Sequence, residues 1–220
     1  PDLRAPLRRL LAPANRVAPS SPSPHREALA VRKLGAGGLF TGRIAAACVE
    51  AVRAHNARRG FPAHRIGLSV ARGGPTAIGN VASYRRLDLS ASDRVATAVH
   101  RALRDGEPPP EMVYHPRALR LLAPIAGRFS DSLLVSDLGR ITLPGVDRVA
   151  LFPTVHGRSA VAFGASEVAD GCATLAIRAR DLSAADAARL LNDAVRRLEH
   201  HTPPSQSARR AAHDQIGLQA

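Results

Sequence analysis

The stretch Ser136-Asp137-Leu138-Gly139-Arg140-Ile141 lies inside a mainly apolar run that extends over residues 132–149. It places a carboxylate and a glycine between two segments that are otherwise typical of β-strands. A carboxylate among apolar neighbours is costly to desolvate without a partner, and an arginine side chain is a natural partner for it. We therefore expect a sheet strand that carries a partnered polar group at Asp137.

Strand-like and helix-like patterns alternate along the rest of the chain. Apolar residues at every second position indicate strands, and apolar residues at three- and four-residue spacing indicate helices. The expected strands are 29–34, 65–71, 78–87, the segments around 136–141, and then 147–153, 159–166 and 172–178. The expected helices are 41–58 with Thr41 as N-cap, 92–104, 116–126 and 183–200. This order predicts an α+β fold.

Composition divides the chain into three parts. Residues 1–26 combine a basic stretch with a Pro/Ser-rich segment at 13–24, which is typical of a crossover or linker. Residues 27–201 hold the periodic patterns, and 202–220 form a polar tail. Because 13–24 and 202–220 lack the apolar periodicity that offsets the entropy of ordering, we expect both to pack little.

The net charge of +13 would by itself favour a nucleic-acid partner. The distribution argues against one, because Lys33 is the only lysine and the arginines are scattered along the whole chain. Aromatic residues make up 3% of the chain, so the stacking platforms of single-strand binders are missing. No apolar run is long enough for a membrane span. Cys48 and Cys172 form no metal or redox motif, so we expect two small buried hydrophobes and a reducing, cytoplasmic setting.

Two motif-like stretches are better explained as structure. The glycines at 35–42 match neither phosphate-binding fingerprint, because Phe40 replaces a required glycine in one pattern and Arg43-Ile44 replaces Lys-Ser/Thr in the other. Gly164-Ala165-Ser166 lacks the second glycine of a nucleophile elbow. We therefore expect a turn and a strand at these positions.

The order of elements resembles the C-terminal lobe of the condensation-domain and acyltransferase superfamily. This superfamily includes chloramphenicol acetyltransferase, plant BAHD transferases, peptide-synthetase condensation domains and polyketide-associated acyltransferases. The residues that carry the resemblance are Asp137-Leu138-Gly139, similar to the family's Asp-Phe-Gly motif, the helix at 41–58, and Arg72 followed by Gly79-Asn80. The resemblance implies a lobe with a mixed or largely antiparallel sheet of about five or six strands and helices on one face.

The resemblance also implies a structural motif beside an active-site channel. Its members here are Arg72, Gly79, Asn80, Ser136, Asp137 and Gly139. We expect Arg72 and Asp137 to form an ion pair, since an unpaired buried charge would cost several kcal/mol.

The family's catalytic signature is a pair of histidines followed three residues later by an aspartate. The histidine pair of this chain, His200-His201, is followed by Thr-Pro-Pro-Ser-Gln. We therefore expect no catalytic residue and no metal site in this chain, and an N-terminal lobe that carries the histidine motif elsewhere. Because the chain starts at Pro1 and its sole methionine is Met112, we expect a fragment or a processed product.

By resemblance, the intact enzyme transfers an acyl group from a thioester to an alcohol or amine. The donor substrate would be acyl-coenzyme A or an acyl or peptidyl carrier protein with its phosphopantetheine, and no cofactor would be bound permanently. Two alternatives stay open. The chain could be a non-catalytic lobe that docks a carrier protein through its arginines, or an arginine-rich nucleic-acid binder.

Overall fold

The computed structural model describes residues 9–20, 27–34, 40–72, 83–105, 131–155, 159–169 and 171–200. Six strands form one sheet in the order β1-β6-β5-β4-β2-β3. Their bounds are β1 Glu27–Leu34, β2 Arg65–Arg72, β3 Ser83–Ser90, β4 Leu133–Ile141, β5 Val161–Val168 and β6 Ala173–Arg180. Strands β2, β4 and β5 are parallel to one another at the centre. Strand β3 pairs antiparallel with β2 on one side, and β6 pairs antiparallel with β5 and β1 on the other. The predicted mixed sheet is confirmed.

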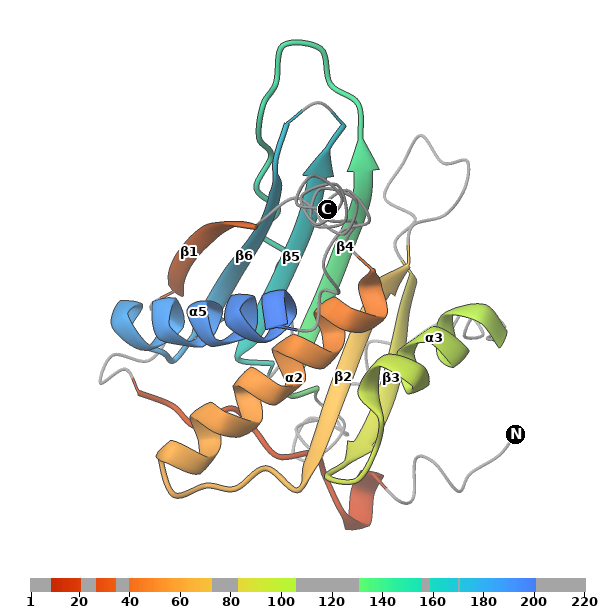
Figure 1. Ribbon diagram of the computed structural model, residues 1–220. Coiled ribbons are helices and arrows are strands. Elements are labelled where there is room, and N and C mark those ends of the chain that lie inside the picture. Colours follow the sequence, from red (N-terminus) through yellow and green to blue (C-terminus); the bar gives the residue numbers. More distant parts are fainter. Residues whose placement is uncertain are drawn as a thin grey trace, which may run out of the picture.

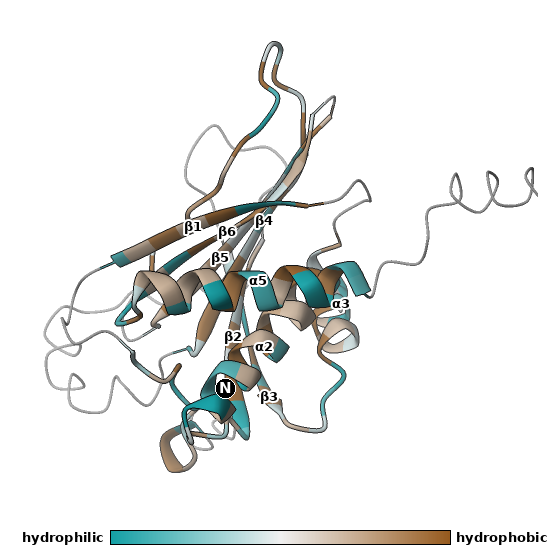
Figure 2. Ribbon diagram, turned by 60° about the vertical axis from the view of Figure 1, so that its left-hand side comes forward, coloured by the Kyte–Doolittle hydropathy of each residue, from teal (hydrophilic) through white to brown (hydrophobic). Residues whose placement is uncertain are grey.

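Three helices pack on one face of this sheet (Figure 1). They are α2 Thr41–Arg58, α3 Val95–Asp105 and α5 Ala184–His200. Hydrophilic and apolar residues alternate along α5 (Figure 2), and its buried residues include Leu190, Leu191 and Leu198. The predicted placement of helices on one face is confirmed. Among the described helices none is both long enough and apolar enough to cross a membrane.

The main core lies between the helices and the sheet. Its largest fully buried side chains include Phe163 of β5, Leu68 of β2, Ile44 of α2 and Leu190 of α5. Each such side chain stabilises the fold by about 1.5–3 kcal/mol relative to an exposed position. Cys48 is fully buried here, and burial raises the pKa of its thiol, so the expectation of a small buried hydrophobe is confirmed for it.

The opposite face of the sheet is crossed by the extended segment 147–155. This segment was predicted as a strand over 147–153, and that prediction is wrong. The hydroxyls of Ser166 and Thr174 each donate to the carbonyl oxygen of Val149 over 2.6 Å. Because side chains rather than a strand ladder satisfy this carbonyl, an apolar alternating pattern here gives an extended cover and not a seventh strand.

The cover lies close to the sheet where β5 carries Gly164. A Cβ atom at this position would lie 2.1 Å from the carbonyl oxygen of Leu151. Val155 of the cover, Leu134 and Ala162 form a second, smaller apolar cluster on this face. Ser166 is thus a structural residue of the sheet, as expected from its incomplete elbow motif.

The N-terminal segment 13–20 is packed, which corrects the expectation that it packs little. Val17 and Ala18 are buried at 3% and 4% exposure. The side-chain amide of Asn56 donates to the carbonyl of Arg16 over 2.7 Å and accepts from the amide of Ala18 over 2.9 Å. Polar groups at the end of α2 hold this segment, so its lack of apolar periodicity gave a wrong prediction.

Several other predictions lie outside the described residues. They are the turn at 35–38, the helix at 116–126, the first part of the strand at 78–87 and the tail at 202–220. The boundaries 1–26, 27–201 and 202–220 stay predictions.

Candidate functional site

The candidate site lies at one edge of the sheet, where the parallel strands β2, β4 and β5 end. Carboxyl ends of parallel strands meet at the same edge, and open α/β sheets commonly bind ligands there. Val70 of β2 is level with Val135 of β4. The residue pairs between these two strands end there, and Arg72 and Asp137 each follow two residues later on their own strand. The first turn of α2 reaches the same edge, as a direct contact between the helix and β4 shows.

Asp137 joins β4 to the start of α2. The hydroxyl of Thr41 donates to Oδ2 of Asp137 over 2.8 Å, and the backbone amide of Gly139 donates to Oδ1 over 2.8 Å. Thr41 is the first residue of α2, and the first turn of this helix carries no acidic residue of its own. The half-buried carboxylate of Asp137 therefore places a negative charge near the helix N-terminus, where the helix dipole favours it.

This contact corrects the predicted role of Thr41. The helix begins after Phe40, and no side-chain cap bonds its first amides. Thr41 is already the first helical residue, one position beyond the N-cap whose side chain would accept from the first amides. Its hydroxyl donates to Asp137 instead. A threonine before an apolar helix predicted the helix start correctly but gave no signal for the residue that it would bond.

Residues 137–139 form a bulge at the end of β4. The register between β4 and β5 shifts between Asp137 and Arg140. Gly139 has φ of +66°, a left-handed conformation that glycine adopts without steric cost. A bulge re-aims the side chains around it, and Leu138 here is exposed at 48%. The Asp-x-Gly motif therefore has a structural reason in this chain: the aspartate bonds the amide two residues on, and the glycine supplies the backbone conformation.

Of the other predicted site residues, one lies fully within the described part of the chain and three do not. Ser136 is half-buried in β4. The side chain of Arg72 and both Gly79 and Asn80 lie outside the described residues, so the ion pair between Arg72 and Asp137 stays a prediction. A role of these residues beside a catalytic channel also stays a prediction.

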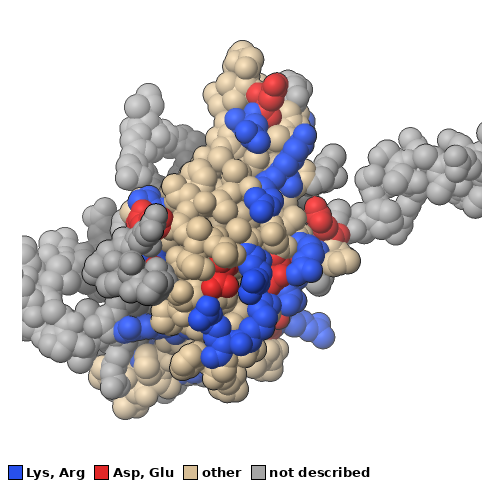
Figure 3. Space-filling view, turned by 90° about the vertical axis from the view of Figure 1, so that its left-hand side faces the viewer, with Lys and Arg blue, Asp and Glu red and all other residues tan. Residues whose placement is uncertain are grey.

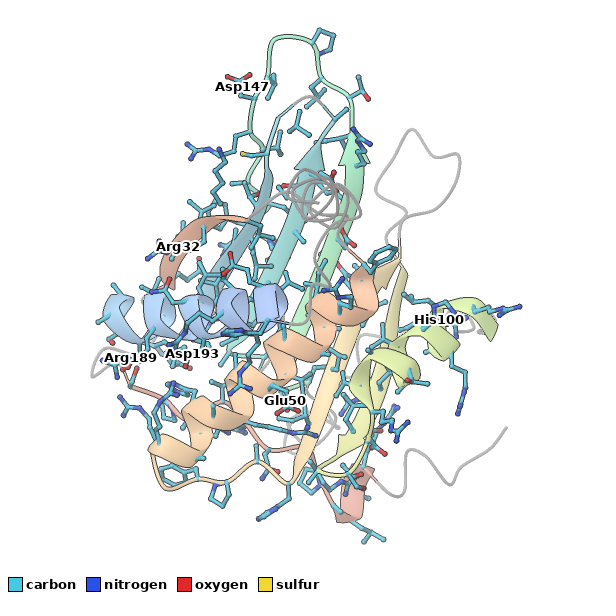
Figure 4. All side chains as sticks on the ribbon, viewed as in Figure 1. Arg32, Glu50, His100, Asp147, Arg189 and Asp193 are labelled. Atoms are coloured by element: carbon cyan, nitrogen blue, oxygen red, sulfur yellow. The ribbon has the colours of Figure 1, made fainter. Side chains whose placement is uncertain are left out.

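Beyond the bulge, the chain projects past the end of the sheet and turns at residues 142–146. This projection is visible above β4 and β5 in Figure 1, with Asp147 labelled beside its tip in Figure 4. The projection exposes Leu143 and Val146 at 45% and 37%, next to Leu138 of the bulge at 48%. This projection was not predicted from the sequence, although the apolar residues on both sides of Pro144-Gly145 could have indicated an apolar turn.

The histidines that the structure describes do not gather at this edge. His55 is buried near the other end of α2, where Nε2 lies 3.0 Å from the carbonyl oxygen of Ala18. His64, His100 and His200 are exposed on three different elements. Among the described residues, no group of three or more potential ligands is placed to hold a metal ion.

The described part of the chain combines a mixed six-stranded sheet, helices on one face and a bulged Asp-x-Gly strand. No protein-family model and no curated protein sequence matches this chain. Solved structures do match. The chain has the fold of about half of a condensation domain.

Two of these structures represent the matches. The condensation domain that mediates chain release from the enacyloxin polyketide synthase matches with a TM-score of 0.56 and 14% identity, over 93% of this chain and 49% of that chain. The epimerization domain from the third module of tyrocidine synthetase B matches with a TM-score of 0.51 and 11% identity, over 90% of this chain and 54% of that chain. The chain thus spans about half the length of each structure. At such identities the likeness shows the fold alone, and it confirms the fold that the sequence predicted.

Proposed function

We propose that this chain is the C-terminal lobe of a condensation-type acyltransferase. The observation that supports the proposal most is the match over 93% of this chain to 49% of a condensation domain. A lobe of this kind works together with a second lobe that carries the catalytic histidine motif. The donor would be a thioester on coenzyme A or on the phosphopantetheine of a carrier protein, and the acceptor an alcohol or amine.

The proposed chemistry needs one base and one leaving thiol. A histidine of the other lobe takes the proton from the acceptor hydroxyl or amine, whose oxygen or nitrogen attacks the thioester carbonyl. The resulting oxyanion collapses, the new ester or amide bond forms, and the carbon–sulfur bond breaks. The thiolate leaves with a proton, so the products are the acylated acceptor and the free thiol.

In this scheme the present chain supplies one wall of the channel. Asp137 ties β4 to the start of α2, and Gly139 allows the bulge that turns Leu138 outward. The exposed apolar side chains Leu138, Leu143 and Val146 then offer the surface on which the other lobe packs, because exposed apolar residues of this kind are stabilised by a partner.

Thiol release measured with the isolated chain and with the chain joined to its first lobe tests the proposal. Acyl-coenzyme A and an acylated carrier protein serve as donors, with a panel of alcohols and amines as acceptors. We expect no turnover by the isolated chain and turnover by the joined lobes. In the joined enzyme, Leu143→Asp should lower activity by weakening the contact between lobes, whereas the exposed and distant Leu11→Asp should leave it unchanged.

Turnover by the isolated chain that is abolished when one of its own histidines is replaced would refute the proposal. Binding of the first lobe without any turnover would favour the alternative of a non-catalytic lobe.

A further inference from the structure

Strand β1 leaves one edge of the sheet open. It pairs with β6 along one side, and it is the outermost strand of the described sheet. The edge is eight residues long, and proteins usually cover or shorten such an edge, because its backbone groups can pair with a further strand. Figure 3 views the molecule from the side of β1: charged side chains gather most densely in the lower part, and a broad uncharged area lies above them. The open edge of β1 is therefore a candidate interaction surface.

The two faces of β1 carry different side chains. Ala28 and Leu34 belong to the core beneath the helices. Arg32, labelled in Figure 4, donates to the side chain of Asn192 on α5 over 2.7 Å. Because side chains alternate along a strand, the even-numbered residues of β1 face the helices and the odd-numbered residues face the opposite side. These odd-numbered residues are Glu27, Leu29, Val31 and Lys33.

The odd-numbered side chains form a pattern that is acidic at one end, apolar in the middle and basic at the other end. Leu29 is exposed at 58%. Lys33 is exposed as well, and it makes no ion pair among the described residues. Glu27 uses Oε2 to accept from Nε and Nη2 of Arg178 over 2.8 and 2.6 Å. Its Oε1 can therefore accept from a further donor.

This pattern is complementary to itself about a two-fold axis through Ala30. When a second copy of β1 runs antiparallel to the first, Glu27 lies opposite Lys33 of the second copy. In the same register Leu29 lies opposite Val31 of the second copy. The axis repeats both pairs, so the two strands share two pairs of opposite charge and two apolar pairs, and such cross-strand pairs stabilise a sheet. A shift by two residues in either direction leaves a charge without its partner, so the pattern favours this register.

We propose that this chain forms a homodimer through antiparallel pairing of its β1 strands. The two six-stranded sheets become one continuous sheet, with the helices of both copies on the same face. A two-fold symmetric dimer needs a surface that is complementary to itself, and the charge pattern of β1 meets this requirement. The interface contains no residue of the candidate site, so the inference does not depend on the proposed acyl transfer.

Sedimentation velocity of this chain between about 2 and 200 μM tests the proposal. Because the net charge of +13 repels a second copy at low salt, the measurement uses about 150 mM salt, which screens distant charges. We expect the mass to rise with concentration from 23.2 kDa toward twice that value. A mass of 23.2 kDa over the whole range would overturn the proposal.

Two charge reversals test the register. Glu27→Lys makes both charged pairs of the dimer positive, and Lys33→Glu makes both negative, so we expect each variant alone to weaken dimer formation about tenfold. An equimolar mixture of the two variants restores both pairs of opposite charge, and it should associate within roughly threefold of the unchanged chain. Loss of the Arg178 contact in Glu27→Lys cannot produce this rescue. Circular dichroism checks that both variants are folded.

Net charge alone predicts a different result. Glu27→Lys raises the net charge and Lys33→Glu lowers it, so general repulsion would weaken one dimer and strengthen the other. The same charge changes at exposed positions away from β1, Glu199→Lys and Arg104→Glu, should change association less than about twofold. Opposite effects of the two β1 variants, equally large effects of the distant variants, or a mixture that associates no better than each variant alone would overturn the proposal.

Discussion

Replacing Gly164 by alanine should destabilise the fold more than any other glycine-to-alanine change in the middle of the sheet. An added Cβ atom would lie 2.1 Å from the carbonyl oxygen and 2.8 Å from the carbonyl carbon of Leu151. Both are backbone atoms, so the contact is relieved only if the cover segment 147–155 moves away from β5. Such overpacking typically costs about 1–3 kcal/mol, and a clash with backbone belongs at the upper end of that range.

The expected cost can be set against the intrinsic effect of the substitution. Alanine restricts the unfolded chain and by itself stabilises a compatible site by about 0.4–1 kcal/mol. A net loss of about 2–3 kcal/mol remains, which lowers the melting temperature by roughly 4–12 °C for a protein of this size. Thermal unfolding followed by circular dichroism, together with urea titration, measures both quantities.

Gly67→Ala is the matched control, because it makes the same chemical change in the neighbouring part of the sheet. There the added Cβ would lie 3.1 Å from the Cβ of Ala14 and 3.2 Å from Nη2 of Arg86. The Cα of Asp131 would lie 3.3 Å away. All three contacts are tight, but they are about 1 Å longer than the contact at Gly164 and need only small shifts, so we expect a change within about 1 kcal/mol. If Gly164→Ala proved no more destabilising than Gly67→Ala, the close packing of segment 147–155 on the sheet would be refuted.

Three further predictions concern polar groups. Asn56→Ala should lower the free energy of unfolding by about 2–4 kcal/mol, because it leaves two backbone groups of segment 13–20 without their partner. Protease cleavage within 13–20 should become faster, and an unchanged cleavage rate would contradict this role of Asn56. Burial would raise the pKa of Asp193, but hydrogen bonds and charges of its two arginines hold it below its usual value. The carboxylate therefore contributes its full stabilisation above about pH 3.9, and this contribution is lost as the pH falls through the lower pKa of the folded state. Asp193→Asn should therefore make the free energy of unfolding depend less on pH in the acid range. Asp137→Ala should cost about 1–3 kcal/mol and Asp137→Asn less, and a double-mutant cycle with Arg72→Ala that shows no coupling would disprove their predicted ion pair.

The fold could be predicted well because its elements have strong local patterns. Helix α2 occupies the residues predicted for it, and α5 and the described strands agree with prediction within a few residues. Strand β4 was predicted from the apolar segments on both sides of the Asp-x-Gly stretch. A partner for Asp137 was predicted because a carboxylate in an apolar run is costly to desolvate alone.

The sequence was less informative where polar contacts between distant segments determine the structure. Segment 13–20 lacks periodicity, and its packing depends on Asn56 and His55, which lie about 40 residues away. Segment 147–155 has a strand-like pattern, but the hydroxyls of Ser166 and Thr174 bond it as a cover. Such pairings leave no local signal, because each partner alone is an ordinary helix or strand residue.

The candidate site was predicted only in part, because some of its contacts also join segments that are distant in the sequence. Asp137 and Gly139 were identified from their motif, and the structure supplies the contacts that explain it. Thr41 was identified only as a helix start, because no local pattern connects it to a carboxylate 96 residues away. The projection with Leu143 and Val146 was missed, because exposure of apolar residues depends on how far the chain extends beyond the sheet.

The pairing of β1 with β6 affects how the chain is synthesised and folded. Glu27 lies opposite Arg180, so the first strand of the sheet pairs with the last one. During translation β1 leaves the ribosome before β6, and within the described sheet β6 is the strand that it pairs with. Contacts between such distant segments slow folding, and an unpaired strand can associate with other chains in the meantime. We therefore expect nascent chains that stop before β6 to depend on chaperones, whereas chains that extend past Arg180 can complete the sheet on their own.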